Sequence, residues 1–264
     1  MKLRPKSTRV KAPANIRPAP QASTPSTAHD VVSPNPQGRD AADRRKDKGF
    51  LTCKEHKQVG TLNTRTLSEE YKRKELANIF NRVKLSILGI TDHKIVHTKD
   101  DDAVKYWKLE NCTLITTSAW RNSRGAAVGG VGIVLDKHAE KSLSEVTPIN
   151  HRILAVTFNG NPSTTVIVNY SPVEGSDESE AHYRKLTEVA NGIPKHNLLI
   201  ECGDFNAHLG ETDAPFTYHQ HTNSNGTFLL EHTTECNLIV TNTQRRKKKG
   251  KLWTYISDMN GRKR

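Results

Sequence analysis

Several features that define other protein classes are missing from this sequence of 264 residues. It contains no run of about 18 apolar residues, which excludes a transmembrane helix. The basic residues in the first ten positions are not followed by an apolar stretch, which argues against a secretory signal. The hydrophobic fraction is only 34%, so part of the chain is expected to be disordered or rich in loops.

Cysteine is also scarce. The four cysteines are Cys53, Cys112, Cys202 and Cys236, and no two of them form a C-x-x-C pair. This spacing suggests neither a zinc site nor a disulfide framework. We expect reduced thiols in an intracellular protein, with Cys112 and Cys202 as small core residues because they lie inside apolar runs.

Acidic residues are outnumbered by basic ones, and the formal net charge is +12. A balance this basic favours a polyanionic partner, with nucleic acid first and an acidic membrane surface second. The alternative is a basic soluble protein without such a partner.

Residues 1–50 have a different composition from the rest. They hold seven of the twelve prolines, eleven Lys or Arg against four Asp, and one aromatic residue, Phe50. Such a segment cannot bury enough apolar surface to offset its ordering entropy, so we predict a disordered basic tail. A mitochondrial transit peptide is disfavoured because the prolines oppose an amphipathic helix. A nucleic-acid-binding arm or a nuclear-import signal, and hence a nuclear protein, is the preferred interpretation.

From residue 57 to residue 264 the hydrophobic pattern predicts one domain of alternating strands and helices. Strands are expected over 58–61, 85–90, 113–117, 129–135, 153–158, 165–170, 198–201 and 238–241, and helices over 69–83, 179–191 and 225–234. Asn159-Gly160-Asn161-Pro162 is a strong hairpin signal. Hairpins and crossovers occur together, so we predict an α/β fold of mixed sheets covered by helices rather than a Rossmann or TIM fold.

The strongest local feature is Gly203-Asp204-Phe205-Asn206, which follows the apolar run from Leu198. A buried strand here delivers a carboxylate and a carboxamide to its C-terminal end, where ligand sites of α/β sheets lie. The pair could orient a water molecule and a phosphate oxygen together. An Asx-turn that only bonds its own backbone explains the same pattern equally well.

Three further segments place polar side chains at strand ends. Asn63 could bind a hard cation through its carbonyl oxygen, or could simply lead into a helix. Asp92 is a candidate Mg²⁺ ligand, or a solvated acid. Tyr170 could donate to a phosphoryl oxygen, although taken alone it is better explained as a core or edge tyrosine.

Read together and in this order, these segments resemble the endonuclease/exonuclease/phosphatase superfamily. The closer resemblance is to the endonuclease domains of RTE-clade LINE retrotransposons and to the related craniofacial development protein 2-like sequences. The matching segments are Thr116-Thr117-Ser118-Ala119-Trp120-Arg121-Asn122, Gly129-Gly130-Val131-Gly132, Asn169-Tyr170-Ser171-Pro172, Gly203-Asp204-Phe205-Asn206-Ala207, Asn223-Ser224-Asn225-Gly226 and Arg246-Lys247-Lys248-Lys249-Gly250-Lys251-Leu252-Trp253-Thr254.

The resemblance implies a four-layered sandwich and cleavage of a phosphodiester with Mg²⁺ or Mn²⁺. Asn63 matches the asparagine beside the metal, and Asp92 takes the place of a metal-binding glutamate. Tyr170 matches the tyrosine at the scissile phosphate. Asp204 and Asn206 match the pair that activates or orients the attacking water and the phosphate.

Two departures from the family pattern stand out. Asp92 is one methylene shorter than glutamate, which should weaken Mg²⁺ binding. His93 and His97 could compensate, but they are expected to be surface residues. The family pattern continues to a final Asp-His or Asp-Tyr pair, whereas this chain ends at Gly261-Arg262-Lys263-Arg264. We therefore expect a C-terminally truncated domain that lacks its final strand or strands and has an unpaired sheet edge.

A run of cations precedes Trp253. It comprises Arg245, Arg246, Lys247, Lys248, Lys249 and Lys251. A solvated loop is the usual explanation of such a run, but the resemblance favours a loop that contacts DNA phosphates.

Three functions remain open at this stage. The first is a DNA endonuclease that nicks a strand, with a reverse transcriptase downstream in a full-length element. The second is an inactive remnant that still binds nucleic acid. The third is a phosphatase of the same superfamily.

Overall fold

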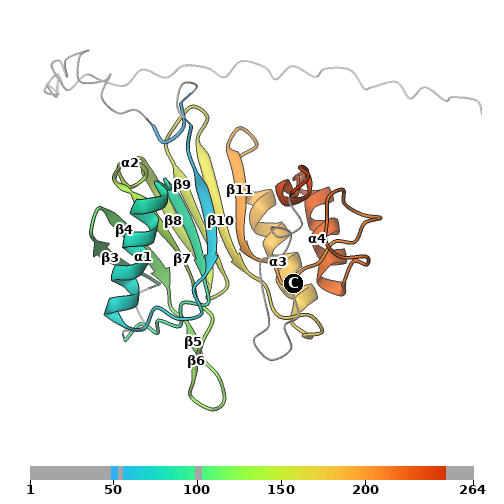
Figure 1. Cartoon of the computed structure of the whole chain (residues 1–264), viewed down its shortest axis with the longest axis horizontal. Helices are drawn as coiled ribbons and strands as arrows, with labels where there is room; N and C mark the ends of the chain where they lie inside the picture. Colours follow the sequence, from blue (N-terminus) through green and yellow to red (C-terminus); the bar gives the residue numbers. More distant parts are fainter. Residues whose placement is uncertain (1–48, 53–55, 99–102, 248–264) are drawn as a thin grey trace, which may run out of the picture. The chain divides into compact units, whose positions relative to one another are not determined.

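The computed structural model describes residues 49–52, 56–98 and 103–247, and two β-sheets face each other within them (Figure 1). The first sheet runs β1 (Val59–Asn63), β2 (Ile87–Thr91), β7 (Val131–Asp136), β4 (Cys112–Thr117), β3 (Val104–Leu109). The second runs β11 (Leu198–Asp204), β10 (Thr164–Tyr170), β9 (Ile153–Phe158), β8 (Leu143–Asn150). A separate hairpin consists of β5 (Trp120–Arg121) and β6 (Ala127–Val128).

Both large sheets are mixed. The pairs β1–β2 and β10–β11 are parallel, and every other pair in the two sheets is antiparallel. Parallel partners end at the same edge of a sheet, so the C-terminal ends of β1 and β2 lie together, as do those of β10 and β11. Across the sandwich β1 contacts β11, and β2 contacts β10. Four strand ends therefore meet at one edge.

The main core lies between the sheets, where alternate side chains of facing strands meet. The opposite faces of the strands are also buried. On β2, Ile87 points into the main core while Leu88 and Ile90 pack against Phe80 of α1 (Glu70–Val83). Because β2 is covered on both sides, it reads in the sequence as a continuous apolar run rather than as an alternation.

Helices form the outer layers. α1 covers the first sheet, whereas α3 (Ser179–Gly192) and α4 (Ser224–Glu235) cover the second. A short helix, α2 (Lys137–Lys141), follows β7 and is capped by the Asp136 carboxylate, which accepts from the Ala139 amide at 2.6 Å. The predicted four-layered sandwich of mixed sheets and flanking helices is thus confirmed.

Some sequence predictions were wrong or incomplete. Residues 238–241 form no strand: the Leu238 amide bonds back to Thr233, and a short 3-10 helix, η2, spans Thr241–Thr243. Phe50, assigned to the tail, is buried against Phe158 at a centroid distance of 5.1 Å. Residues 1–48 lie outside the described part of the chain, so the disordered tail stays a prediction. Strands β3, β5, β6 and β8 and helix α2 were not foreseen.

Cys112, Cys202 and Cys236 are free thiols, as expected, and Cys112 and Cys202 pack in the cores. Among the residues that the structure describes, no helix is both long enough and apolar enough to cross a membrane.

Candidate active site

The meeting point of the four strand ends brings together the polar side chains that the sequence singled out. Asn63 is the last residue of β1, Asp92 follows β2, and Tyr170 and Asp204 are paired at the ends of β10 and β11. The Asn63 carboxamide donates from Nδ2 to Oδ2 of Asp204 at 3.0 Å. Residues that are 141 positions apart in the sequence thus share one site.

The sequence left two interpretations of the turn after β11, an Asx-turn and a carboxylate that serves a site, and the structure is compatible with both. The Asn206 amide donates to Oδ1 of Asp204 at 3.1 Å, which closes an Asx-turn, while Oδ2 is bound by Asn63. Asn206 adopts a left-handed conformation, with φ of 46°, and its side chain donates to the carbonyl of Ser171 at 2.8 Å. The Asp204 carboxylate therefore takes part in the turn and also faces the site.

Glycine is required just before this turn. Gly203 has a φ of 142°, and a Cβ on it would lie 1.8 Å from the carbonyl oxygen of Asn169 on the neighbouring strand. Only a residue without a side chain lets β11 approach β10 closely enough to place Asp204 beside Tyr170.

Asp92 also adopts a left-handed conformation, with φ of 54°. Its carboxylate accepts from the Gly129 amide at 3.2 Å and lies 3.4 Å from the ammonium group of Lys94. Burial raises the pKa of Asp92, the nearby charge of Asp204 adds to the rise, and Lys94 opposes it. Because burial makes the ionised form of Asp92 unfavourable, a cation bound close to the carboxylate would stabilise that form.

Tyr170 lies within the electrostatic reach of both carboxylates. Burial raises its pKa to about 12, with further contributions from the charges of Asp92 and Asp204. The phenol therefore stays protonated at neutral pH and can donate a hydrogen bond to an anionic oxygen.

Arg152 is a site residue that the sequence analysis missed. Its guanidinium lies 4.5 Å from the ring centre of Trp120 and 5.6 Å from that of Tyr170, and it pairs with Glu178 at 3.4 Å. His151 also packs against Trp120, with 4.1 Å between the two ring centres. Arg152 follows β8, which was not foreseen, so no pattern in the sequence placed it near the strand ends.

The expectation that His93 and His97 are surface residues is wrong. His93 is fully buried and accepts from the Ile95 amide at Nδ1, so Nε2 carries the proton towards the Val131 carbonyl. Burial lowers its pKa to about 4. His97 is also buried and bonds Thr116 at 3.1 Å. Both ring nitrogens of His93 are hydrogen-bonded inside the fold, so His93 supports β7 rather than binding a metal.

The donor set of the site suits a hard divalent cation. Asp92 and Asp204 supply carboxylate oxygens, and Asn63 supplies an amide. The described part of the chain has no cluster of three or more His, Cys, Asp or Glu residues that could bind a metal. Mg²⁺ commonly binds through one or two carboxylates and keeps several waters, so these residues fit it better than they fit zinc.

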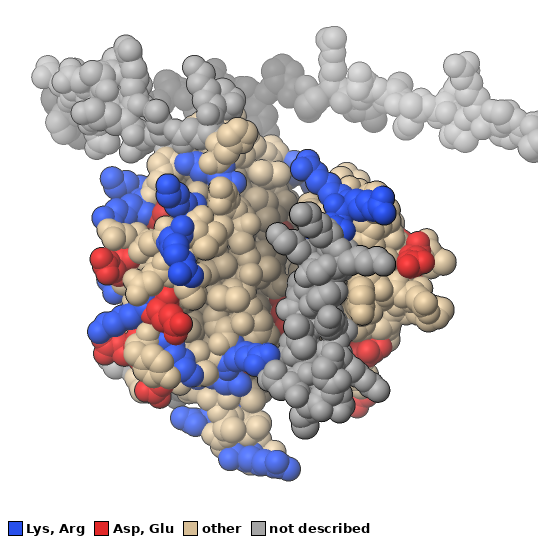
Figure 2. Space-filling view, in the orientation of Figure 1, with Lys and Arg blue, Asp and Glu red and all other residues tan. Residues whose placement is uncertain are grey.

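The candidate nucleic-acid residues are only partly described. Arg245, Arg246 and Lys247 are exposed and follow η2 in the chain. Val240, just before η2, packs in the core that α3 and α4 cover. The structure does not bring them into contact with the catalytic candidates. Lys248, Lys249 and Lys251 lie outside the described residues. Figure 2 shows other Lys or Arg side chains on the projecting β5–β6 hairpin, where Arg121 and Arg124 are exposed.

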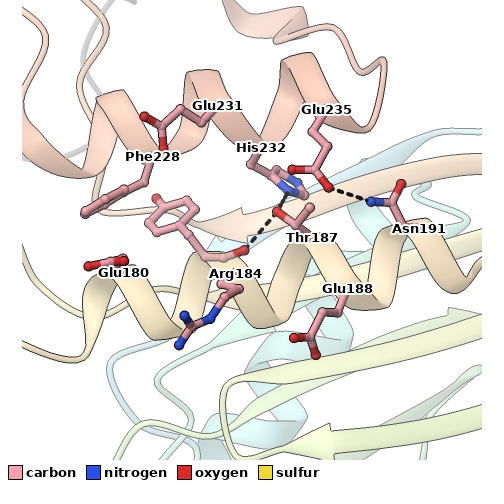
Figure 3. A pocket seen from close by; sticks show the side chains of 10 residues that line it. Glu180, Arg184, Thr187, Glu188, Asn191, Phe228, Glu231, His232 and Glu235 are labelled. Carbon is pink, nitrogen blue, oxygen red and sulfur yellow. Dashed lines mark hydrogen bonds between the residues drawn. The ribbon is translucent and has the colours of Figure 1, made fainter.

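A second polar cluster lies between β11 and the helices that cover it. His232 of α4 bonds Glu201 at 2.8 Å through Nε2. Through Nδ1 it bonds Thr187 of α3 at 2.8 Å (Figure 3). Thr187 and His232 line a groove of about 490 Å³ between α3 and α4. Glu201, His232 and Thr187 connect β11 to α4 and α3, which is the arrangement expected of a buried structural network.

Comparison with known proteins gives two curated relatives. The chain is 27% identical to craniofacial development protein 2 of Bos taurus over 232 residues and 25% identical to that of Tragulus javanicus over the same length. These matches cover 84% of this chain but only 37% and 38% of the relatives. No protein-family profile matches the chain.

Among solved structures, the endonuclease domain of TRAS1, a telomere-specific non-LTR retrotransposon, matches with a TM-score of 0.46 and 18% identity, over 68% of this chain and 72% of that one. The 3' phosphatase NExo from Neisseria bound to a DNA hairpin matches with a TM-score of 0.49 and 17% identity, over 69% and 71%. The sequence match, rather than these structural scores, carries the relationship. The resemblance to craniofacial development protein 2 is thus confirmed, and this chain is similar in sequence to about two fifths of that protein.

Proposed function

We propose that this chain carries a divalent-metal-dependent phosphodiesterase site that nicks DNA. One observation carries the proposal: four strand ends from two sheets place Asn63, Asp92, Tyr170 and Asp204 at a single edge. Two carboxylates, an amide and a protonated phenol suit phosphoryl chemistry better than acyl transfer or redox chemistry. The net charge of +12 supports a polyanionic substrate.

In this proposal, Asp92 with Asn63 would hold Mg²⁺, which supplies charge neutralisation at the phosphate. Asp204 takes a proton from the attacking water, because its carboxylate lies at the site and is oriented by Asn63 and the Asn206 amide. Tyr170 donates from its hydroxyl to a phosphate oxygen. Asn206 fixes the loop by donating to Ser171.

The hairpin that carries Arg121 and Arg124 projects from the same edge as the site, since the Gly129 amide that follows β6 bonds Asp92. Exposed cations at this position can contact backbone phosphates on either side of the cleaved bond. Arg245, Arg246 and Lys247 are not in contact with the catalytic candidates, and their exposure and charge alone support a second phosphate contact.

The proposal is tested by nicking of supercoiled plasmid in the presence of Mg²⁺ or Mn²⁺. We expect the chain to convert supercoiled to open-circular DNA, and Asp204→Ala to abolish the conversion. Asp213→Ala is the matched control, because Asp213 is an exposed acid that contacts Thr222 in the loop after β11.

Two other outcomes would replace the proposal. DNA binding without nicking, unchanged in Asp204→Ala, would favour a protein that only binds nucleic acid. Release of inorganic phosphate from a 3'-phosphorylated oligonucleotide, without plasmid nicking, would favour a phosphatase.

A further inference from the structure

A buried asparagine outside the predicted site connects the two loops that carry it. Asn225 lies in the first turn of α4 and is fully buried. Its Nδ2 donates to the carbonyl of Pro172 at 2.9 Å and to that of Asn206 at 3.1 Å. Pro172 is the second residue after Tyr170, and Asn206 is the second residue after Asp204.

A carboxamide is well suited to this position. Its amino group has two hydrogens in a fixed plane, so one side chain can satisfy two buried carbonyls. Oδ1 of Asn225, by contrast, is buried and bonds none of the described residues. A buried acceptor without a partner is costly, and the two bonds that Nδ2 donates offset that cost.

The start of α4 is itself held rigidly. The Asn223 side chain accepts from the Gly226 amide at 2.8 Å, which caps the helix, and from the His208 amide at 2.9 Å. α3 adds a further contact, because the Tyr183 hydroxyl donates to the carbonyl of Phe205 at 2.7 Å. The base from which Asn225 reaches the loops therefore cannot shift without breaking these bonds.

We propose that Asn225 is a positioning residue that sets the separation between the Tyr170 hydroxyl and the Asp204 carboxylate. The inference rests on the proposed phosphodiesterase function for its catalytic consequence, but not for the link between the loops. α4 would thereby act on the reaction from behind the sheet, without touching the substrate.

The test compares Asn225→Asp and Asn225→Ala in the full chain with Asn191→Ala as a matched control. Asn191 donates to Glu235 at 3.0 Å and thus also connects α3 to α4, but it is exposed and contacts neither loop. Amide hydrogen exchange is measured first, at Ser171 and Val173 on either side of Pro172 and at residues 204–207. It needs neither metal nor DNA.

We expect both Asn225 variants to accelerate exchange in the two segments together, and Asn191→Ala to leave both unchanged. Asn225→Asp should regain protection as the pH falls, because a protonated carboxyl can donate to one carbonyl, whereas Asn225→Ala cannot. If a variant fails to fold, Asn225→Ser, which keeps one donor, replaces it.

Plasmid nicking is measured second. A misplacement of about 1 Å can cost about 100-fold in rate, so we expect kcat to fall about 10- to 100-fold with KM changed less than about twofold. Faster exchange confined to the first turn of α4, or to one loop only, would overturn the inference. If the unmodified chain does not nick DNA while both segments loosen together, the positioning link stands and the proposed function fails.

Discussion

β11 carries two acids, Glu201 and Asp204, whose surroundings differ. They are three positions apart, so they point to opposite faces of the strand. Ile200 and Cys202 pack in the core between the sheets, which places Asp204 on the inner face, beside Asn63 of β1. Leu199 packs in the helix-covered core, and Glu201 points the same way, to His232.

The two acids differ less in burial than in what they contact. Glu201 is 7% exposed and its partner His232 is 1% exposed, so the pair is sealed beneath α4. Among the described residues, Asp204 is bound only by amide groups, and it lies at the end of its strand near a second carboxylate. Glu201 is bound by an imidazole and connects β11 to α4, whereas Asp204 has neutral donors, lies near another carboxylate and is available for chemistry.

The largest expected effect separates the two acids by function. Asp204→Asn removes the proton acceptor and should lower the nicking rate about 10²- to 10⁴-fold, with little change in thermal stability. Glu201→Gln, the same change on the opposite face, should leave kcat within about threefold. Single-turnover nicking assays and thermal unfolding of both variants measure this. Equal losses of rate would show that the distinction between the two faces is false.

The second prediction concerns stability. Glu201→Leu leaves Nε2 of the buried His232 without its partner and should cost about 1 to 3 kcal/mol in free energy of unfolding. Glu201→Leu combined with His232→Leu should recover most of that loss, because neither side chain of the pair is then left buried without the other. Urea unfolding of the two single variants and the double variant provides the measurement. A double variant as unstable as the sum of the single variants would contradict it.

The third prediction uses the pKa of Tyr170. Tyr170→Phe removes one donor to an anionic oxygen and should lower kcat about 10- to 100-fold. Because the pKa of Tyr170 is raised to about 12, the hydroxyl keeps its proton across the neutral and mildly alkaline range. The ratio of wild-type to variant rates should therefore be constant from about pH 6 to pH 10. A ratio that falls above about pH 9 would show that the phenol ionises in the site.

The smallest expected effect is a loss of DNA affinity, caused by substitutions in the segment that follows η2. Arg245→Ala with Arg246→Ala should weaken DNA binding several-fold and leave kcat unchanged. Each lost phosphate contact should reduce the slope of log K against log salt by about 0.9. Binding isotherms at several salt concentrations, with Arg121→Ala and Arg124→Ala compared in parallel, show which side contacts the phosphates. An unchanged slope would make Arg245 and Arg246 a solvated loop.

Much of the fold could be predicted from the sequence, because a local pattern was enough to identify many of its strands and helices. Apolar runs predicted the central strands β2, β7, β9 and β10 because both of their faces are buried. Spacing predicted α1, α3 and α4. The edge strands β3 and β8 are only partly buried and mix polar with apolar residues, so no apolar run marks them. The 238–241 segment has the composition of a strand but no strand beside it to pair with among the described residues.

The candidate site divides in the same way. Asp204, Asn206, Asn63 and Tyr170 were marked by their order along the chain and by a family resemblance. Trp120 and Asn225 lie in segments that match the family, but neither was assigned a role from the sequence, and Arg152 lies outside those segments. The importance of all three lies in contacts with residues that are distant in the sequence.

By itself, the sequence determined which residues could do chemistry here: acids, amides and a tyrosine placed directly after buried strands, in a strongly basic chain. The tertiary structure decided which of them meet. Parallel pairing of β1 with β2 and of β10 with β11 brings four strand ends to one edge. The two-residue period of β11 turns Asp204 towards the inner face of its sheet and Glu201 towards the face that the helices cover. Glu201 and Asp204 are chemically alike in the sequence, and only the packing of β11 between a sheet and two helices separates their environments.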